Sequence, residues 1–389
     1  MTVSQLAPHR HAARVQRDRW AVTAVFLLNG LTLSTYIVRA PSFKATHDLS
    51  DVRFGLSGLL FAMAALACMQ AVGPLAARLG TRTILRGALA VMPLLLAGLA
   101  VAPGPEWYLI GSAVLGGVHG ATDAAMNASA VAVEREAKRP ILNGCHAAWS
   151  VSAVVASLST AALAHLGVSL AAHLVATGAL LLAGGLAAAR WLPDNGRAKA
   201  EPGAPVSLRS GWSRPLVLLG LTATALMICE GAALGWGGIF LHEARNASLS
   251  LAAVAITAYT GGQTLGRLAG DRLTRRGGGN RLFRIGALIA AGGFAVAVLA
   301  PHPGVAVAGF ALAGLGSSVL VPLTYSAVGR LPGASTAALV SRLTTFTYTG
   351  ILLGPALIGW AAGHLGLAVT MTVVIPLLLL VIVVPRPKQ

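Results

Sequence analysis

Long apolar stretches alternate with short polar segments along the whole chain. Most of the stretches are about 20 residues long, the length at which an α-helix crosses the hydrocarbon core of a bilayer. The pattern therefore predicts an all-α membrane protein with 12 transmembrane helices. The predicted spans cover about residues 20–38, 54–77, 84–102, 107–133, 144–165, 168–189, 215–240, 250–270, 285–300, 304–328, 338–361 and 366–384.

Basic residues are concentrated in every second segment between these spans. All but four of the 29 Lys and Arg residues lie on one side of the predicted topology, and the exceptions are Arg39, Lys44, Arg53 and Arg245. Because Lys and Arg are enriched in cytoplasmic loops, both termini are predicted to be cytoplasmic. Only 11% of the residues are charged, against about 25% in a soluble domain. The net charge of +17 therefore follows from topology, and we expect no nucleic-acid partner.

The chain repeats itself after half of its length. Gly73 opens a segment rich in Gly and Arg after the second span, and Gly266 opens a similar segment after the eighth. Each half thus contains six spans, and the Pro- and Gly-rich segment between the halves is typical of a polar linker. The predicted parts are a cytoplasmic tail at 1–19, a six-helix bundle at 20–189, a cytoplasmic linker at 190–214, a second bundle at 215–384 and a cytoplasmic tail at 385–389.

The repeated segment resembles the signature of the major facilitator superfamily, Gly-x-Leu-Ala-Asp-Arg-x-Gly-Arg-Arg. Here it reads Gly-Pro-Leu-Ala-Ala-Arg-Leu-Gly-Thr-Arg from Gly73 and Gly-Arg-Leu-Ala-Gly-Asp-Arg from Gly266. The resemblance implies the major facilitator fold, with two pseudo-symmetric six-helix bundles. It also implies a gating role for Gly73, Arg78, Gly80, Arg82, Gly266, Asp271 and Arg272. An ordinary basic loop that only sets topology is the alternative.

The two copies of this segment depart from the signature in different ways. Ala77 stands where the first copy usually has Asp, and Asp271 comes one residue late in the second copy. An acidic-to-basic gate contact, formed by Asp271 with a nearby Arg, is therefore expected in the C-terminal half rather than in the N-terminal half.

Several other segments resemble a poorly characterised bacterial branch of the superfamily near the fucose and other sugar permeases. These segments are 127–134, 146–150, 230–232 with Trp236, and 350–359. This resemblance implies a small polar substrate and leaves its identity open.

Glu230 is an ionisable residue inside the seventh span, where small residues follow it at Gly231, Ala232 and Ala233. An ionisable group in a span is costly and usually faces the bundle interior, a cavity or a partner. We therefore predict that Glu230 couples transport to protons or binds the substrate. A structural carboxylate paired with a basic group such as Arg39 is the alternative.

The fourth span carries His119, Asp123 and Asn127 at successive i, i+4 spacing, so they share one helical face. A polar stripe in a helix surrounded by lipid is expected to face a water-filled path. We predict Asp123 as the second proton carrier, and His119 and Asn127 as substrate-binding residues. A hydrogen-bonded seam between helices is the alternative.

The resemblance implies that spans 1, 4, 7 and 10 line a central cavity. Span 1 offers Asn29 and Tyr36, and span 10 offers Tyr325, with a predicted kink at Pro322. These three polar residues are predicted to bind the substrate. Trp236 is a further candidate because aromatic faces stack on sugar rings or cations, and a residue of the interfacial aromatic belt is the alternative.

The motifs of several other protein classes are missing from the sequence. The three cysteines are far apart and have no metal or disulfide spacing. Neither a phosphate-binding Gly-x-x-x-x-Gly-Lys-Ser/Thr run nor a His-Glu-x-x-His motif occurs. We therefore expect no cofactor, no metal ion and no enzymatic activity.

The predicted function is secondary active transport of a small polar solute by alternating access with proton symport. A sugar is one candidate for this solute. The expected location is the bacterial inner (plasma) membrane, and the expected partners are a small-molecule substrate, protons and the lipid bilayer, with the protein as a monomer. One alternative is proton-driven efflux of amphipathic or cationic compounds, although the Gly-x-x-x-Gly-Pro run typical of drug antiporters lies in span 11, at 350–355, instead of span 5. A non-transporting membrane sensor or scaffold is the second alternative.

Overall fold

The computed structural model describes residues 3–194, 212–332 and 334–385, and within these residues it is built of helices, with no β-strand. The chain divides into two compact units. The first unit comprises Met1–Ile141, Cys145–Gly211 and Gly333–Thr344, and the second comprises Leu142–Gly144, Trp212–Pro332 and Thr345–Gln389. Most of the predicted linker at 190–214 and nearly all of the predicted tail at 385–389 lie outside the described residues.

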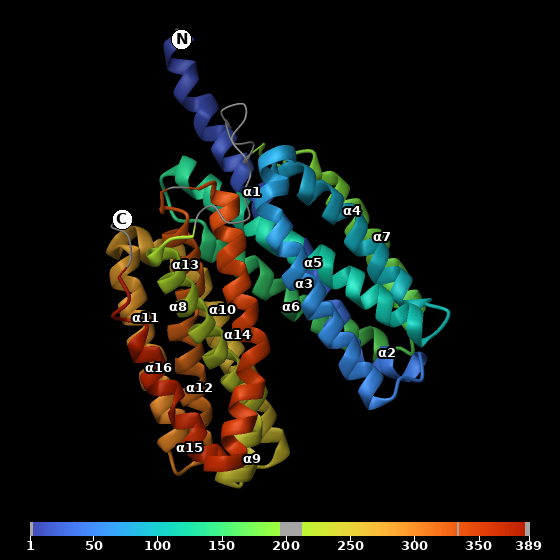
Figure 1. The fold of residues 1–389 in the computed structure, drawn as a ribbon, viewed down its shortest axis with the longest axis vertical. Helices are drawn as coiled ribbons and strands as arrows, with labels where there is room; N and C mark the ends of the chain where they lie inside the picture. The colour runs from blue at the N-terminus through green and yellow to red at the C-terminus, as the bar shows by residue number, and fades with distance from the viewer. Residues whose placement is uncertain (1–2, 195–211, 333, 386–389) are drawn as a thin grey trace. The chain divides into compact units, whose positions relative to one another are not determined.

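Seven helices supply most of the first unit (Figure 1). They are α1 (Val3–Val38), α2 (Ala40–Thr46), α3 (Asp51–Leu79), α4 (Thr81–Ala100), α5 (Pro105–Ala137), α6 (Leu142–His165) and α7 (Leu170–Ala189). The most extensive packing in this unit joins α3 to α5 and α4 to α7. A methyl group on Gly116 or Gly120 of α5 would overlap the backbone of α3 at Phe61 or Ala65. Small residues thus allow the two helices to approach closely, as in other membrane bundles.

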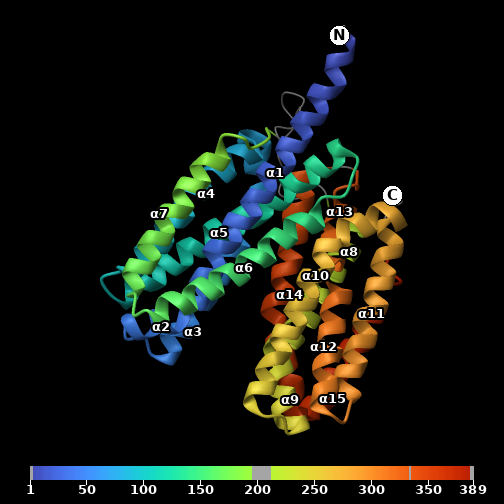
Figure 2. The same cartoon turned by 180° about the vertical axis from the view of Figure 1, so that it is seen from behind.

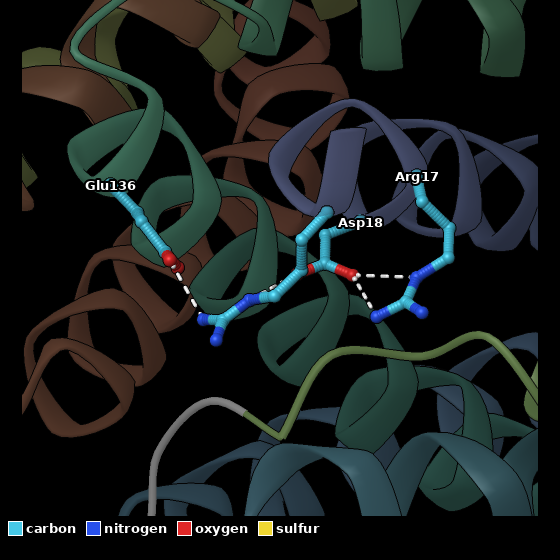
Figure 3. Close-up of polar contacts among 4 residues, drawn as sticks. Arg17, Asp18 and Glu136 are labelled. Atoms are coloured by element: carbon cyan, nitrogen blue, oxygen red, sulfur yellow. Dashed lines mark hydrogen bonds and ion pairs between the residues drawn. The ribbon is translucent and has the colours of Figure 1, made fainter. Parts of the chain in front are cut away.

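The segment predicted as an N-terminal tail is helical from Val3, because α1 continues without a break into the first predicted span. Polar contacts hold this part of α1 to α5 (Figure 3). The buried carboxylate of Asp18 lies 3.3 Å from the Arg17 guanidinium and 3.7 Å from that of Arg14. Arg14 in turn lies 2.7 Å from a carboxylate oxygen of Glu136.

The second unit contains shorter and more interrupted helices. They are α8 (Arg214–Gly231), a π-helical segment η1 (Ala232–Trp236), α9 (Gly237–Arg245), α10 (Leu249–Gly277), α11 (Gly279–Leu299), α12 (Pro303–Ser317), α13 (Leu320–Val328), most of α14 (Thr336–Leu365), α15 (Leu367–Thr372) and α16 (Val374–Leu380). The break between α12 and α13 falls three to four residues before Pro322. The break between α15 and α16 is at Val373, three residues before Pro376. Proline lacks the N–H that would bond four residues back, so both breaks have the expected position, and the predicted kink at Pro322 corresponds to the first.

The core of the second unit lies among α10, α11 and α12, which run side by side in Figure 2. A methyl group on Gly314 of α12 would overlap the backbone of Tyr259 in α10. Phenylalanine rings fill the space beside these close approaches, and Phe294 packs edge-on against Phe310 with ring centroids 6.1 Å apart.

Among the described residues, eight helical segments are long and apolar enough to cross a membrane. Large apolar side chains remain on the outside of the helices, and Leu158, Leu180 and Leu299 are 67%, 75% and 67% exposed. Such exposure would be unfavourable in water and suits contact with lipid. Eight is fewer than the 12 predicted spans, so the count of 12 stays a prediction.

Candidate functional site

A buried hydrogen-bonded cluster joins three helices of the first unit. Asn29 of α1 accepts a hydrogen bond from Trp149 Nε1 of α6 at 3.3 Å through its side-chain oxygen. Its amide nitrogen lies 3.3 Å from His119 Nδ1 of α5 and donates to it. Asn29 and His119 are only 2% and 3% exposed. Two of the predicted substrate-binding residues are thus in contact with each other, as the alternative of an interhelical seam describes.

A small cavity lies beside this cluster. Asn29, Thr32 and Thr122 provide its polar lining, and its other walls come from Leu28, Ala88, Leu89, Met92, Pro93 and Leu181. It has room for the centre of roughly one water molecule. In this conformation the space beside Asn29 therefore suits a water rather than a solute of the size of a sugar.

Tyr36 lies two turns further along α1, in an aromatic group. Its hydroxyl donates to Ser112 Oγ at 3.2 Å and lies 3.4 Å from the hydroxyl of Tyr108. Its ring stacks on Phe61 with centroids 5.7 Å apart, and the ring of Phe61 also lies 5.7 Å from that of His119. Phe61 therefore joins two predicted substrate-binding residues, although the sequence offered no signal for it beyond one aromatic side chain in an apolar span.

Asp123 and Asn127 contact each other one turn apart on α5. The amide nitrogen of Asn127 donates to the backbone oxygen of Asp123 at 2.9 Å and to its carboxylate at 3.4 Å. The amide oxygen of Asn127 is buried and has no hydrogen-bond partner. Within the described part of the chain, Asp123 forms no ion pair with Lys, Arg or His. Its carboxylate is therefore held by one weak hydrogen bond alone.

Glu230 is the second-last residue of α8, and Gly231 separates it from the π-helical segment. A π-helical turn is wider than an α-helical turn and occurs frequently at functional sites. Glu230 is partly buried and forms no hydrogen bond or ion pair with another described residue. Arg39, named above as an alternative partner for Glu230, instead contacts His173 Nδ1 at 3.0 Å and Ser42 Oγ at 3.4 Å, all within the first unit.

Trp236 closes the π-helical segment and contacts α14. Its Nε1 donates to the backbone oxygen of Pro355 at 3.3 Å, and a methyl group on Gly359 would lie 2.9 Å from its ring. The glycines that precede Pro355 pack α14 against α8. A methyl group on Gly350 would lie 2.6 Å from the backbone oxygen of Thr224 in α8. The Gly-x-x-x-Gly-Pro run is therefore a helix-packing surface. Tyr325, the last predicted substrate-binding residue, is 2% exposed on α13.

The predicted gating segments are mostly helical, including the parts that the sequence placed between two spans. α3 continues to Leu79 and α10 to Gly277, so only one glycine separates each helix from the next. These glycines, Gly80 and Gly278, have φ of 80° and 76°, a backbone conformation that favours glycine. The Arg and Leu residues of the motif are good helix formers, so the helix stops only where such a glycine allows the turn.

Gly73 and the arginines of the first segment have different surroundings. A methyl group on Gly73 would lie 3.0 Å from the backbone of Ala338, at the start of α14 and within the first unit. Arg78 is exposed, and Arg82 has a buried Nε without a hydrogen-bond partner. Gly73 is thus a position of close helix approach.

The second gating segment centres on Asp271. Its carboxylate accepts hydrogen bonds from the backbone N–H of Asn143 at 3.1 Å and of Gly144 at 3.0 Å, and from the Asn143 side chain at 3.1 Å, all within the second unit. These contacts bring Asp271 to the first N–H groups of α6, where the helix dipole favours an anion. The contact with an Arg stays a prediction. Gly266 packs closely on Ser318, and Arg272 is exposed.

Comparisons with known proteins agree with the resemblance found in the sequence. The model of the Major Facilitator Superfamily matches residues 22–245. An uncharacterised MFS-type transporter of Yersinia pestis is 32% identical over 356 residues, which cover 92% of each chain. The chain belongs to the major facilitator superfamily. It is a multi-pass membrane protein of a family of transporters, and the prediction that it is not an enzyme is confirmed by these relatives.

Solved structures of the superfamily share the fold. The E. coli fucose:proton symporter FucP has a TM-score of 0.78 at 16% identity, covering 94% of this chain and 97% of that one. The proton:xylose symporter XylE has a TM-score of 0.74 at 13% identity, covering 97% of each chain. At these identities the likeness establishes the fold alone.

Proposed function

We propose that this member of the superfamily is a proton-coupled secondary transporter of a small polar solute, with Glu230 as the main proton carrier and Asp123 as the second. The observation that carries the proposal is the position of Glu230 beside a π-helical segment, without a hydrogen bond or ion pair to another described residue. A carboxylate that takes up and releases a proton must not be held charged by a fixed cation. Glu230 and Asp123 both meet this condition.

The proposed substrate contacts come from Asn29, Tyr36, His119, Asn127, Trp236 and Tyr325. Amide, hydroxyl and imidazole groups suit a polyhydroxylated solute, because each can donate or accept a hydrogen bond. FucP, a fucose:proton symporter, and XylE, a proton:xylose symporter, share the fold of this chain. A sugar-like solute is therefore the first class to test.

We extend the proposal to the topology that the charge pattern predicts. Twelve spans with cytoplasmic termini would place the basic segments at 78–86 and 267–284 beside the anionic face of the inner membrane. The bundles at 20–189 and 215–384 would rock about a central site, with the protein acting as a monomer.

The gating residues would act where helices approach or are capped. We propose that the contacts of Asp271 with the start of α6, and of Gly73 with the start of α14, form in one state of the transport cycle and open in another. Gly80 would provide a turn, and Gly266 a close approach, while Arg78, Arg82 and Arg272 would hold these helix ends at the lipid headgroups.

Solute-driven proton flux tests the proposal. Purified protein is reconstituted into liposomes containing a pH-sensitive dye, and fucose, xylose, amino acids, organic acids and tetraphenylphosphonium are added in turn. We expect a small polar solute to drive proton entry. Glu230→Gln should abolish that flux and spare solute exchange, because the amide cannot carry the proton but keeps the shape of the side chain.

Glu243→Gln is the matched control, since Glu243 is an exposed carboxylate of the same unit. It should transport like the unmodified protein. Unchanged proton flux in Glu230→Gln would contradict the role of Glu230. If tetraphenylphosphonium were the one compound to drive proton flux, the proposal of solute uptake would be replaced by efflux of lipophilic cations.

A further inference from the structure

Arg39 is a buried arginine without a carboxylate partner in the described part of the chain. It lies between α1 and α2 and is 6% exposed. Its Nε donates to His173 Nδ1 at 3.0 Å, and its Nη1 donates to Ser42 Oγ at 3.4 Å. Its Nη2 is buried and has no hydrogen-bond partner, and Arg39 forms no ion pair with a described acidic residue. The positive charge is therefore both enclosed and uncompensated.

The neighbours of Arg39 cannot neutralise this charge. Because Arg39 Nε donates to His173 Nδ1, that imidazole nitrogen must accept, and the ring gives Arg39 a dipole instead of a negative charge. His173 is only 3% exposed and occupies the first turns of α7, whose N-terminus carries the positive end of the helix dipole. The Ser42 oxygen accepts from Arg39, so its O–H remains available as a donor.

Burying an unpaired guanidinium is costly, and its N–H groups need acceptors. From these contacts we propose that Arg39, supported by His173 and Ser42, forms a binding site for a small anion. Arg39 Nη2 and the Ser42 hydroxyl provide the unused donors, and Ser42 is only partly buried, so it connects the site with the protein surface. The anion is either a carboxylate of a solute or a halide.

The position of Arg39 favours the carboxylate of a solute. Asn29, Thr32, Tyr36 and Arg39 recur at spacings of three and four residues, which places them on one face of α1 up to its end. Arg39 lies about one helical turn from Tyr36. A solute bound at Tyr36 could therefore reach Arg39 with an acidic group. The inference concerns binding alone and holds whether or not transport is coupled to protons.

Binding to the purified, detergent-solubilised protein tests the inference without requiring transport. Melting temperature is measured in a buffer whose anion is a bulky sulfonate, during titration with sodium galacturonate, sodium chloride or neutral galactose. We expect galacturonate to raise the melting temperature. Any response to galactose should be the same in the unmodified protein and in Arg39→Gln. Arg39→Gln should weaken anion binding by about 10–100-fold, the effect of losing one charge-assisted hydrogen bond.

Two further variants keep the test decisive. Arg53→Gln is the matched control, because Arg53 is exposed and pairs with exposed Glu106 at 3.4 Å, and it should bind anions normally. Ser42→Ala removes one donor without touching the charge, so it remains informative if Arg39→Gln does not fold, and it should weaken binding by about tenfold or less. A chloride response equal to that of galacturonate would assign the site to a halide. Anion responses that are absent, or that persist unchanged in both Arg39→Gln and Ser42→Ala, would overturn the site.

Discussion

Two regions of the protein, the Asn29 cluster of the first unit and the surroundings of Glu230 in the second, satisfy their polar side chains to different degrees. In the first unit Asn29 contacts both Trp149 and His119, and Tyr36 contacts Ser112, so polar groups on different helices satisfy one another. In the second unit Glu230 lies beside a π-helical turn and forms no hydrogen bond or ion pair with a described residue. The difference separates polar groups that join helices from a carboxylate to which no described residue is hydrogen-bonded.

The second unit does not lack the means to satisfy a carboxylate. Asp271 in the same unit is 7% exposed and accepts three hydrogen bonds from residues at the start of α6. Its charge is stabilised by backbone N–H groups and by the dipole of the helix. The isolation of Glu230 is therefore a local property of its surroundings, and it singles out Glu230 as the residue to test first for proton coupling.

The largest effect on stability is expected from breaking the cluster of the first unit. Asn29→Leu leaves both the Trp149 N–H and His119 Nδ1 without their partner, so the free energy of unfolding should fall by about 2 kcal/mol. Unfolding in mixed micelles, followed by circular dichroism, measures this change. In the background of Trp149→Phe the same substitution should cost less, because the indole N–H is already absent. Equal losses in both backgrounds would mean that the hydrogen bond does not contribute.

An intermediate effect is expected at Asp271. Asp271→Asn removes the charge and one of the two acceptor oxygens that face the start of α6, so the free energy of unfolding should fall by about 1 kcal/mol. The same unfolding measurement applies. Arg272→Gln, an exposed neighbour on α10, should stay within about 0.5 kcal/mol. If the two variants were equally stable, the cap on α6 would have no energetic role.

The smallest effect on stability is expected at Glu230 itself. Since its carboxylate forms no hydrogen bond or ion pair with a described residue, Glu230→Gln should change the free energy of unfolding by about 0.5 kcal/mol or less. The proposed loss of proton-driven flux would then be a functional defect of a normally folded protein. A large loss of stability in this variant would instead make Glu230 a structural residue, and its contrast with the Asn29 cluster would disappear.

The sequence predicted individual positions in the site better than their partners. The i, i+4 spacing placed His119, Asp123 and Asn127 on one face of a helix, and α5 is continuous through all three. Yet His119 contacts Asn29, 90 residues away, while Asn127 contacts Asp123 on its own helix. Spacing along one helix is a local property, whereas the helix that faces it is not.

The gating segments show the same limit. The superfamily signature drew attention to Asp271 and suggested an Arg as its partner, whereas the hydrogen bond described above joins its carboxylate to the backbone at the start of α6, 128 residues away. The isolated sequence could not reveal this contact because every helix has free N–H groups at its start. Which of them an acidic side chain reaches depends on how the helices pack.

Hydropathy, residue spacing and proline positions by themselves determined that this is a helical membrane protein, where its polar side chains lie along the helices and that the span at 304–328 is interrupted near Pro322. These properties depend on a helix and its solvent, so they can be derived from a short stretch of chain. Only the tertiary structure decided that Asn29 is satisfied, that Glu230 lies beside a π-helical turn without a hydrogen bond, and that Arg39 keeps an unused N–H group. Hydrogen-bond partners in a bundle come from helices distant in sequence, and close packing determines which of them meet.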